Sequence, residues 1–182
     1  MSWAKEGGDD VSGSSEQTDI LEFRQKYDTV LTIFKDMGAQ GVCATVPDVT
    51  SFPFFTTITL DVLARDVWFK EGADTTIIRK ATNDDFILLT ALGLLEDGVG
   101  NTQSNPLPHQ VVLDVDEVAS VRSHTNAINT EIRASAAAHG YFVVDLYSFM
   151  PGLTSGMNFD GIDFSTKFIE GGAFSLDGLH PN

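Results

Sequence analysis

The side chains best suited to chemistry lie at the end of the sequence, where Asp177 and His180 are separated by two residues, one of them Gly178. A serine hydroxyl is too weakly acidic to attack an ester unaided. Ester hydrolases therefore use a histidine to remove its proton and a carboxylate to orient that histidine. Asp and His three positions apart on a glycine-containing turn can supply both groups. On its own the spacing favours a structural turn, and its place after the last expected strand strengthens the case for catalysis.

Two helix-to-strand units precede this turn. Apolar residues recur at intervals of three to four over residues 20–37, which predicts an amphipathic helix that Thr18 or Asp19 begins and Gly38 ends. The apolar run at residues 41–46 then predicts a strand covered on both faces.

The second unit repeats this pattern. Asp114 and Glu117 form a capping-box pattern, the helical spacing continues to Ala138, and Gly140 ends it before a buried strand over residues 141–145. Two such units indicate a parallel sheet with covering helices, so we expect an α/β fold in three layers with right-handed crossovers.

Ligands of parallel α/β sheets bind beyond the carboxyl ends of the strands. The segments 47–51 and 145–148 follow the two strands and are candidates for the rim of a site, although ordinary turns are an equal alternative. Phenylalanines after the first strand could line an acyl or aryl pocket or belong to the core. The predicted pocket residues are Asp48, Val49, Phe54 and Phe55.

The segment of about residues 50–113 is longer than a usual crossover connection. It predicts an insertion, either a cap over a pocket or a structural embellishment. Within it, residues 75–79 and 86–89 are predicted to pair as a hairpin, and loops are expected at residues 97–100 and 105–108.

Composition limits the possible partners. Lys and Arg total 11 against 26 Asp and Glu, a formal net charge of −15, which disfavours nucleic acid and anionic lipid surfaces. The longest apolar stretch, residues 86–95, is too short for a membrane helix.

Cys43 is expected to be a buried hydrophobe. No metal site is expected at His109, His124 or His139, and no cofactor is implied. His139 is expected to complement a helix C-terminus.

The segment SLDGLHPN at residues 175–182 resembles the terminal conserved block of SGNH (GDSL-type) serine hydrolases. Residues 44–57 and 170–182 resemble a Bacteroidota-type branch of that family, and the resemblance extends over residues 2–182. It implies a flavodoxin-like α/β/α sheet, with His180 as general base and Asp177 as its orienting carboxylate. The family's Gly-Asp-Ser and Gly-x-Asn-Asp motifs are not found here; the nearest sequence to the latter is residues 7–10.

The resemblance thus implies one partial SGNH domain over residues 1–182, incomplete at both ends, from a lipase or esterase that acts on lipid, carbohydrate or small esters. We expect the chain alone to be inactive, and an exposed sheet edge to favour association. The parent would be extracytoplasmic by resemblance, while residues 1–17 show no export signal. A non-catalytic interaction or surface protein on the same scaffold, and one half of a split hydrolase, are the alternatives.

Overall fold

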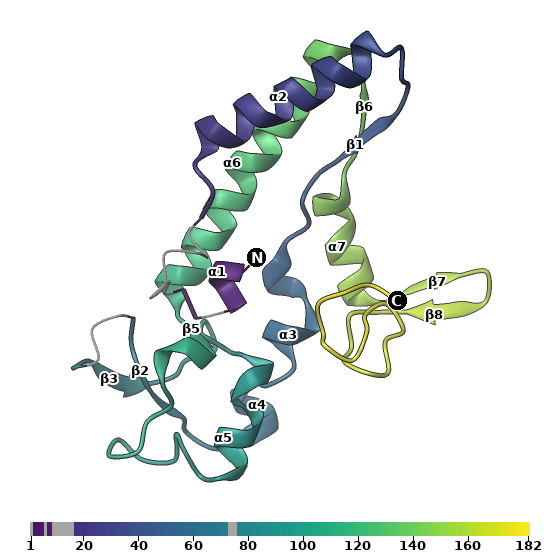
Figure 1. Cartoon of the computed structure of the whole chain (residues 1–182). Helices are drawn as coiled ribbons and strands as arrows, with labels where there is room; N and C mark the ends of the chain where they lie inside the picture. Colours follow the sequence, from purple (N-terminus) through teal and green to yellow (C-terminus); the bar gives the residue numbers. More distant parts are fainter. Residues whose placement is uncertain (1, 6, 9–16, 73–75) are drawn as a thin grey trace.

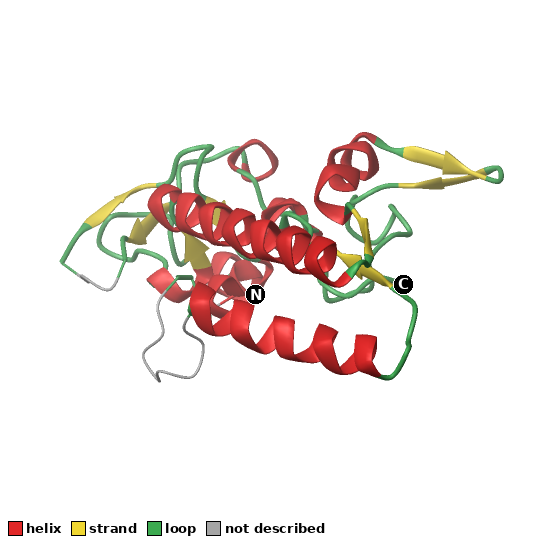
Figure 2. Ribbon diagram, turned by 90° about the horizontal axis from the view of Figure 1, so that it is seen from above, coloured by secondary structure: helices red, strands yellow, loops and turns green. Residues whose placement is uncertain are grey.

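The computed structural model describes residues 2–5, 7–8, 17–72 and 76–182 and shows a mixed α/β chain. Two long helices, α2 (Ile20–Asp36) and α6 (Val115–His139), lie side by side in both views (Figures 1 and 2). The short helix α1 (Ser2–Lys5) contacts α6 near the middle of the molecule.

Both long helices begin and end where the sequence predicts. Asp19 caps α2, because its carboxylate accepts the N–H of Glu22 at 2.9 Å. Asp114 and Glu117 form the predicted capping box of α6, and Gly140 ends that helix in the left-handed conformation at φ +82°. The His139 ring bonds the carbonyl oxygen of Ser135 at 2.8 Å, as expected for a residue in the last turn.

The strands that follow these helices pair in parallel, as predicted. In β1 (Val42–Ala44) and β6 (Phe142–Val144) the register places Cys43 opposite Val143. Cys43 is buried against Leu31 of α2 and Ile132 and Ala136 of α6. The helices therefore cover one face of this pair (Figure 1).

The prediction that both faces are covered is wrong for the described residues. On the face away from the helices, Val42 is 65% and Phe142 80% exposed. A continuous apolar run indicates that a strand is suited to burial on two sides, but it does not supply the second layer. The described chain is mixed α/β, with this parallel pair and three antiparallel pairs in place of one larger sheet.

A side chain of α6 secures the end of β1. Asn129 is buried, its Oδ1 accepts the N–H of Val46 at 2.7 Å, and its Nδ2 donates to the carbonyl oxygen of Val46 at 2.8 Å. The two bonds satisfy both backbone groups of Val46, as a neighbouring strand would. The chain then turns into a 3₁₀ helix, η1 (Val49–Ser51), and α3 (Pro53–Thr56).

Most of the predicted insertion forms a lobe with its own apolar core, at the lower left of Figure 1. Buried Val67, Phe69, Leu107 and Val112 belong to this core. The lobe contains α4 (Leu60–Leu63), β2 (Trp68–Lys70), β3 (Ile78–Lys80), β4 (Phe86–Ile87), η2 (Leu89–Ala91), α5 (Leu92–Glu96), η3 (His109–Val111) and β5 (Val112–Leu113).

The predicted hairpin between residues 75–79 and 86–89 is wrong. β3 pairs with β2, which precedes it, and β4 pairs with β5, which follows some 25 residues later in the chain. Residues 82–85 form a turn, but that turn leads from one sheet to another. Local turn signals therefore located the turn without identifying the partners of its flanking strands.

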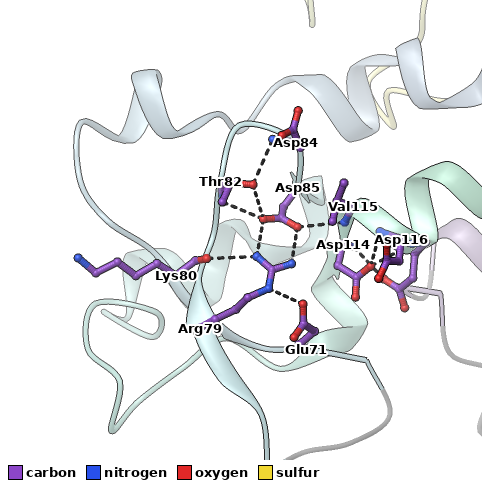
Figure 3. Close-up of polar contacts among 10 residues, drawn as sticks. Glu71, Arg79, Lys80, Thr82, Asp84, Asp85, Asp114, Val115 and Asp116 are labelled. Carbon is purple, nitrogen blue, oxygen red and sulfur yellow. Dashed lines mark hydrogen bonds and ion pairs between the residues drawn. The ribbon is translucent and has the colours of Figure 1, made fainter.

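A buried ion pair joins this turn to α6 (Figure 3). The fully buried carboxylate of Asp85 accepts two hydrogen bonds of 2.7 Å from Arg79 and further ones from Thr82. It also accepts the N–H of Val115, at the first turn of α6, at 3.1 Å. Burial alone raises the pKa of Asp85, but the bonds from Arg79 and Thr82 outweigh it and lower the pKa below its usual value.

After β6 the chain forms α7 (Leu146–Ser155), which Asp145 caps, and a hairpin of β7 (Met157–Phe159) and β8 (Ile162–Phe164). The hairpin projects from the body in both views (Figures 1 and 2). Asp160 and Gly161 make its turn, both at positive φ. Asp-Gly between apolar residues is a strong hairpin signal that the sequence analysis missed.

Replacing Asp85 with Ala is expected to lower the free energy of unfolding by about 3–5 kcal/mol, because Arg79 would lose its buried bidentate partner. Urea unfolding at neutral pH measures the loss. The pKa of Asp85 is lower in the folded than in the unfolded state. The ionised carboxylate therefore stabilises the fold fully above the unfolded pKa of about 4, and this stabilisation disappears as the pH falls through the folded pKa.

The control is Asp84→Ala in the same turn, where the side chain is exposed and the loss should be below about 0.5 kcal/mol. Equal losses for the two variants, or a gap between wild type and Asp85→Ala that persists at low pH, would contradict a stabilising role for the ion pair.

Candidate active site

The C-terminal residues form a tight turn that is closed by its own backbone. The N–H of Ser175 donates to the carbonyl oxygen of His180 at 2.8 Å, and that of Gly178 donates to the carbonyl oxygen of Ser175 at 2.9 Å. Gly178 has a φ of +70°, a conformation that side chains disfavour. The turn therefore fixes the backbone of both predicted catalytic residues.

Asp177 and His180 lie together, as the spacing predicts. Oδ2 of Asp177 forms a short hydrogen bond with Nδ1 of His180, and Oδ1 accepts the backbone N–H groups of Leu179 and His180 at 2.9 and 3.0 Å. The Ser175 hydroxyl donates to Oδ1 at 2.6 Å. These bonds, that from Ser175 foremost, hold the pKa of the Asp177 carboxyl well below its usual range.

An ionised carboxylate beside Nδ1 favours the imidazole tautomer with its proton on that atom. Within the described chain, the ring of His180 makes its hydrogen bond through Nδ1, and the side chain is 78% exposed. The lone pair of Nε2 is then available to accept a proton from a group that approaches from solvent. This is the arrangement that a general base requires.

The turn is anchored to the segment that follows β1. The N–H of Phe54 in α3 donates to the carbonyl oxygen of Gly178 at 3.0 Å. A Cβ added to Gly178 would lie 2.7 Å from the nitrogen of Phe54, so only glycine fits there. Leu179 is buried in the same core cluster as Val49 and Phe52. The end of the chain and the predicted rim segment 47–51 are thus brought together.

The predicted pocket residues differ in their placement. Asp48 caps η1 by accepting the N–H and hydroxyl of Thr50, and it lies 3.6 Å from Arg122 of α6. Val49, Phe54 and Phe55 are buried in the core cluster that includes Leu179. The second rim segment begins with Asp145, which accepts bonds from Ser148, Thr45 and Arg133 and caps α7.

A largely apolar hollow of about 410 Å³ adjoins the turn, between the exit of β1 and α6. Leu179 and Pro181 line it from the turn and His124 from α6, where burial lowers the pKa of the imidazole. Val49 and Phe52 line it, while Phe54 and Phe55 do not. The other apolar lining residues are Trp3, Ala4, Val46, Pro47, Val121 and Ile128.

No serine of the described chain donates a hydrogen bond to His180. Ser51 donates to the carbonyl oxygen of Asp48 at 2.6 Å, and Ser175 donates to Asp177. In the glycine-rich sequence at residues 7–10, Gly8 donates to the carbonyl oxygen of Trp3, and Asp9 and Asp10 lie outside the described residues.

Sequence reasoning also missed two positioning residues. Asn129 holds the exit of β1, from which η1 and α3 lead to the turn, and Thr45 bonds Asp145 and the N–H of Tyr147 at the start of α7. An Asn in mid-helix and a Thr in an apolar strand were the available signals, because each places a polar group where apolar residues are expected.

Comparison with known proteins gives no relative. No family model matches the chain, and neither the curated proteins nor the solved structures contain a match. Among the helices of the described residues, none has the length and apolar character needed to cross a membrane. In the same residues, no three His, Cys, Asp or Glu side chains cluster as a metal site would require.

Replacing Gly178 with Ala is expected to destabilise the chain by about 1–2 kcal/mol through its left-handed backbone and by about 1–3 kcal/mol more through overlap with Phe54. Urea unfolding measures the sum. The matched control is Gly161→Ala, which has φ +84° but nothing within 4 Å of the new Cβ. Equal losses would show that the contact with Phe54 contributes nothing.

The ring of His180 is expected to carry its proton on Nδ1 in the neutral state, because the ionised Asp177 lies beside that atom. Two-dimensional ¹⁵N NMR of the ring nitrogens reports the tautomer. In Asp177→Asn the neutral amide can donate or accept, so a mixture of tautomers is expected. The control Asp160→Asn should leave the spectrum of His180 unchanged. A tautomer mixture already present in the wild type would contradict this geometry.

Proposed function

We propose that this chain supplies the general base and its orienting carboxylate to a serine hydrolase that cleaves carboxylic esters, through His180 and Asp177. The observation that carries the proposal is the short Nδ1–Oδ2 hydrogen bond on a turn that leaves the imidazole exposed. A structural turn needs neither this Asp–His hydrogen bond nor an exposed histidine. The resemblance of residues 175–182 to SGNH hydrolases, and with it the finer three-layer fold, belongs to the same proposal.

The chemistry follows from the geometry. Nε2 would take the proton of a serine hydroxyl as the oxygen attacks the ester carbonyl, and Asp177 would stabilise the imidazolium that results. The imidazolium would then return the proton to the leaving alkoxide, and an acyl-serine would remain for water to hydrolyse. Since no described serine hydroxyl bonds His180, the proposal assigns the nucleophile to a group other than Ser51 or Ser175.

The hollow beside the turn supports an ester with an apolar acyl or alkyl group. Its lining is mainly apolar side chains, with Gln17, Thr18, His124 and Thr125 as polar groups, which is typical of small-molecule sites. The hollow reaches the turn at Leu179 and Pro181, so a substrate bound there would lie next to the catalytic pair.

Fluorophosphonate labelling tests the proposal, because this probe reacts with activated serines. The purified chain alone is expected to give no label. When the wild-type chain is added to an extract of its source cells, a labelled serine protein is expected to appear. With His180→Ala the rate of labelling is expected to fall by about 10³-fold or more. Leu176→Ala, an exposed change in the same turn, is the matched control and should behave as wild type.

Identical labelling with the wild type and His180→Ala would contradict the proposal. That result would favour the alternative of a non-catalytic interaction protein on a hydrolase-like scaffold. Labelling of the chain itself that depends on His180 would retain the reaction but contradict the assignment of the serine.

A further inference from the structure

One edge of the β1–β6 pair has free backbone groups. The N–H of Thr45 donates to the carbonyl oxygen of Val144 at 3.0 Å, so Cys43 and Thr45 direct their backbone groups to β6. Alternate residues of a strand point their groups to opposite edges. Val42 and Ala44 therefore present theirs at the other edge, and no described backbone group bonds them there.

The next residue with the same orientation shows what this edge requires. Val46 presents its N–H and carbonyl oxygen at this edge, and Asn129 satisfies both with its side-chain amide. An amide that accepts and donates in this way reproduces the pairing of an adjacent strand. The edge is thus occupied at Val46 and open at Val42 and Ala44.

An uncharged hollow of about 350 Å³ lies between α2 and the first residues of β1, Val42 and Cys43. Four side chains of α2 line one wall: Tyr27, Val30, Leu31 and Phe34. Residues 39–43 and Tyr141 complete it, and none of them is charged. Val30 and Phe34 are about half exposed, so apolar surface of α2 extends over the space next to β1. A strand placed there would cover it with every second side chain.

We infer that the open edge of β1 and the adjoining hollow bind an extended, alternately apolar segment of a second polypeptide, which adds a strand to the sheet. The free groups of Val42 and Ala44 would provide two donors and two acceptors, and α2 would provide the pockets for alternate side chains. This surface is distinct from the hollow at the Asp177–His180 turn, and the inference does not rest on the proposed catalysis.

The net charge of the chain indicates what charge the bound segment should carry. The chain has a net charge of −15, so a cationic segment is attracted and a second copy of the chain is repelled, while the uncharged lining of the hollow suits apolar side chains. The preferred partner therefore has basic residues flanking its apolar positions.

The test uses a fluorescein-labelled peptide of sequence Lys-Thr-Val-Thr-Val-Thr-Val-Thr-Lys, titrated with the full chain by fluorescence anisotropy at concentrations up to about 1 mM. A peptide with Pro in place of the central Val is the control and should bind about tenfold more weakly or worse, because Pro cannot donate a strand bond.

Three variants locate the site. Ala44→Pro removes an N–H that points to the open edge and has no intramolecular partner among the described residues, so the fold should persist while peptide binding is lost. Phe34→Asp places a charge in the hollow and should also abolish binding. Val143→Pro removes an N–H at the far edge of β6 and should leave binding unchanged. Urea unfolding verifies that each variant is folded.

Loss of binding in Ala44→Pro and Phe34→Asp with retention in Val143→Pro supports the inference. It is overturned if the wild type does not bind the peptide, or if neither edge nor hollow variant weakens binding. It is also overturned if sedimentation reveals a dimer of the wild type that Ala44→Pro dissociates, because the edge would then pair with its own copy.

Discussion

The two hydrogen bonds between Asn129 and Val46 connect the sheet of this chain to its candidate site. They hold the exit of β1 against α6, and η1 and α3 follow within ten residues. α3 in turn carries Phe54, whose N–H fixes Gly178. A buried amide with both functions satisfied is rigid, since either group left unpaired would cost about 1–3 kcal/mol. The position of Asp177 and His180 relative to the sheet thus depends on a side chain in the middle of a helix.

The sequence predicted the features that depend on local chemistry. Helix ends at Asp19, Asp114 and Gly140 follow from groups within a few residues, and so does the pairing of Asp177 with His180. The parallel pairing of β1 and β6 was also predicted, because few sheet topologies are compatible with two helix-to-strand units.

The wrong predictions concern tertiary contacts, which local sequence patterns do not specify. β3 pairs with a strand that precedes it, and the apolar face of Phe142 has no covering layer in the described chain. Asp85 lies in a turn, where a carboxylate is usually exposed, whereas Arg79 allows it to be buried. Burial of a carboxylate depends on a cation brought by the fold, and no spacing rule predicts that encounter. Whether Asp177 and His180 act on an ester stays a prediction, as do the predicted pocket residues.

The site combines a rigid backbone with an exposed ring. Leu179 is buried and Gly178 contacts Phe54, yet the imidazole of His180 lies in solvent. Such a site loses little backbone entropy when a substrate or partner arrives, because hydrogen bonds already close the turn.

The bonds that form the turn itself join residues no more than ten positions apart, from Gly172 to Asn182. Closing so short a loop takes on the order of 10–100 ns, far faster than forming the long-range contacts of the sheet. The acid–base pair can therefore assemble before the rest of the chain has folded. Only its docking onto Phe54, more than a hundred residues earlier in the chain, has to wait for the slow, non-local step.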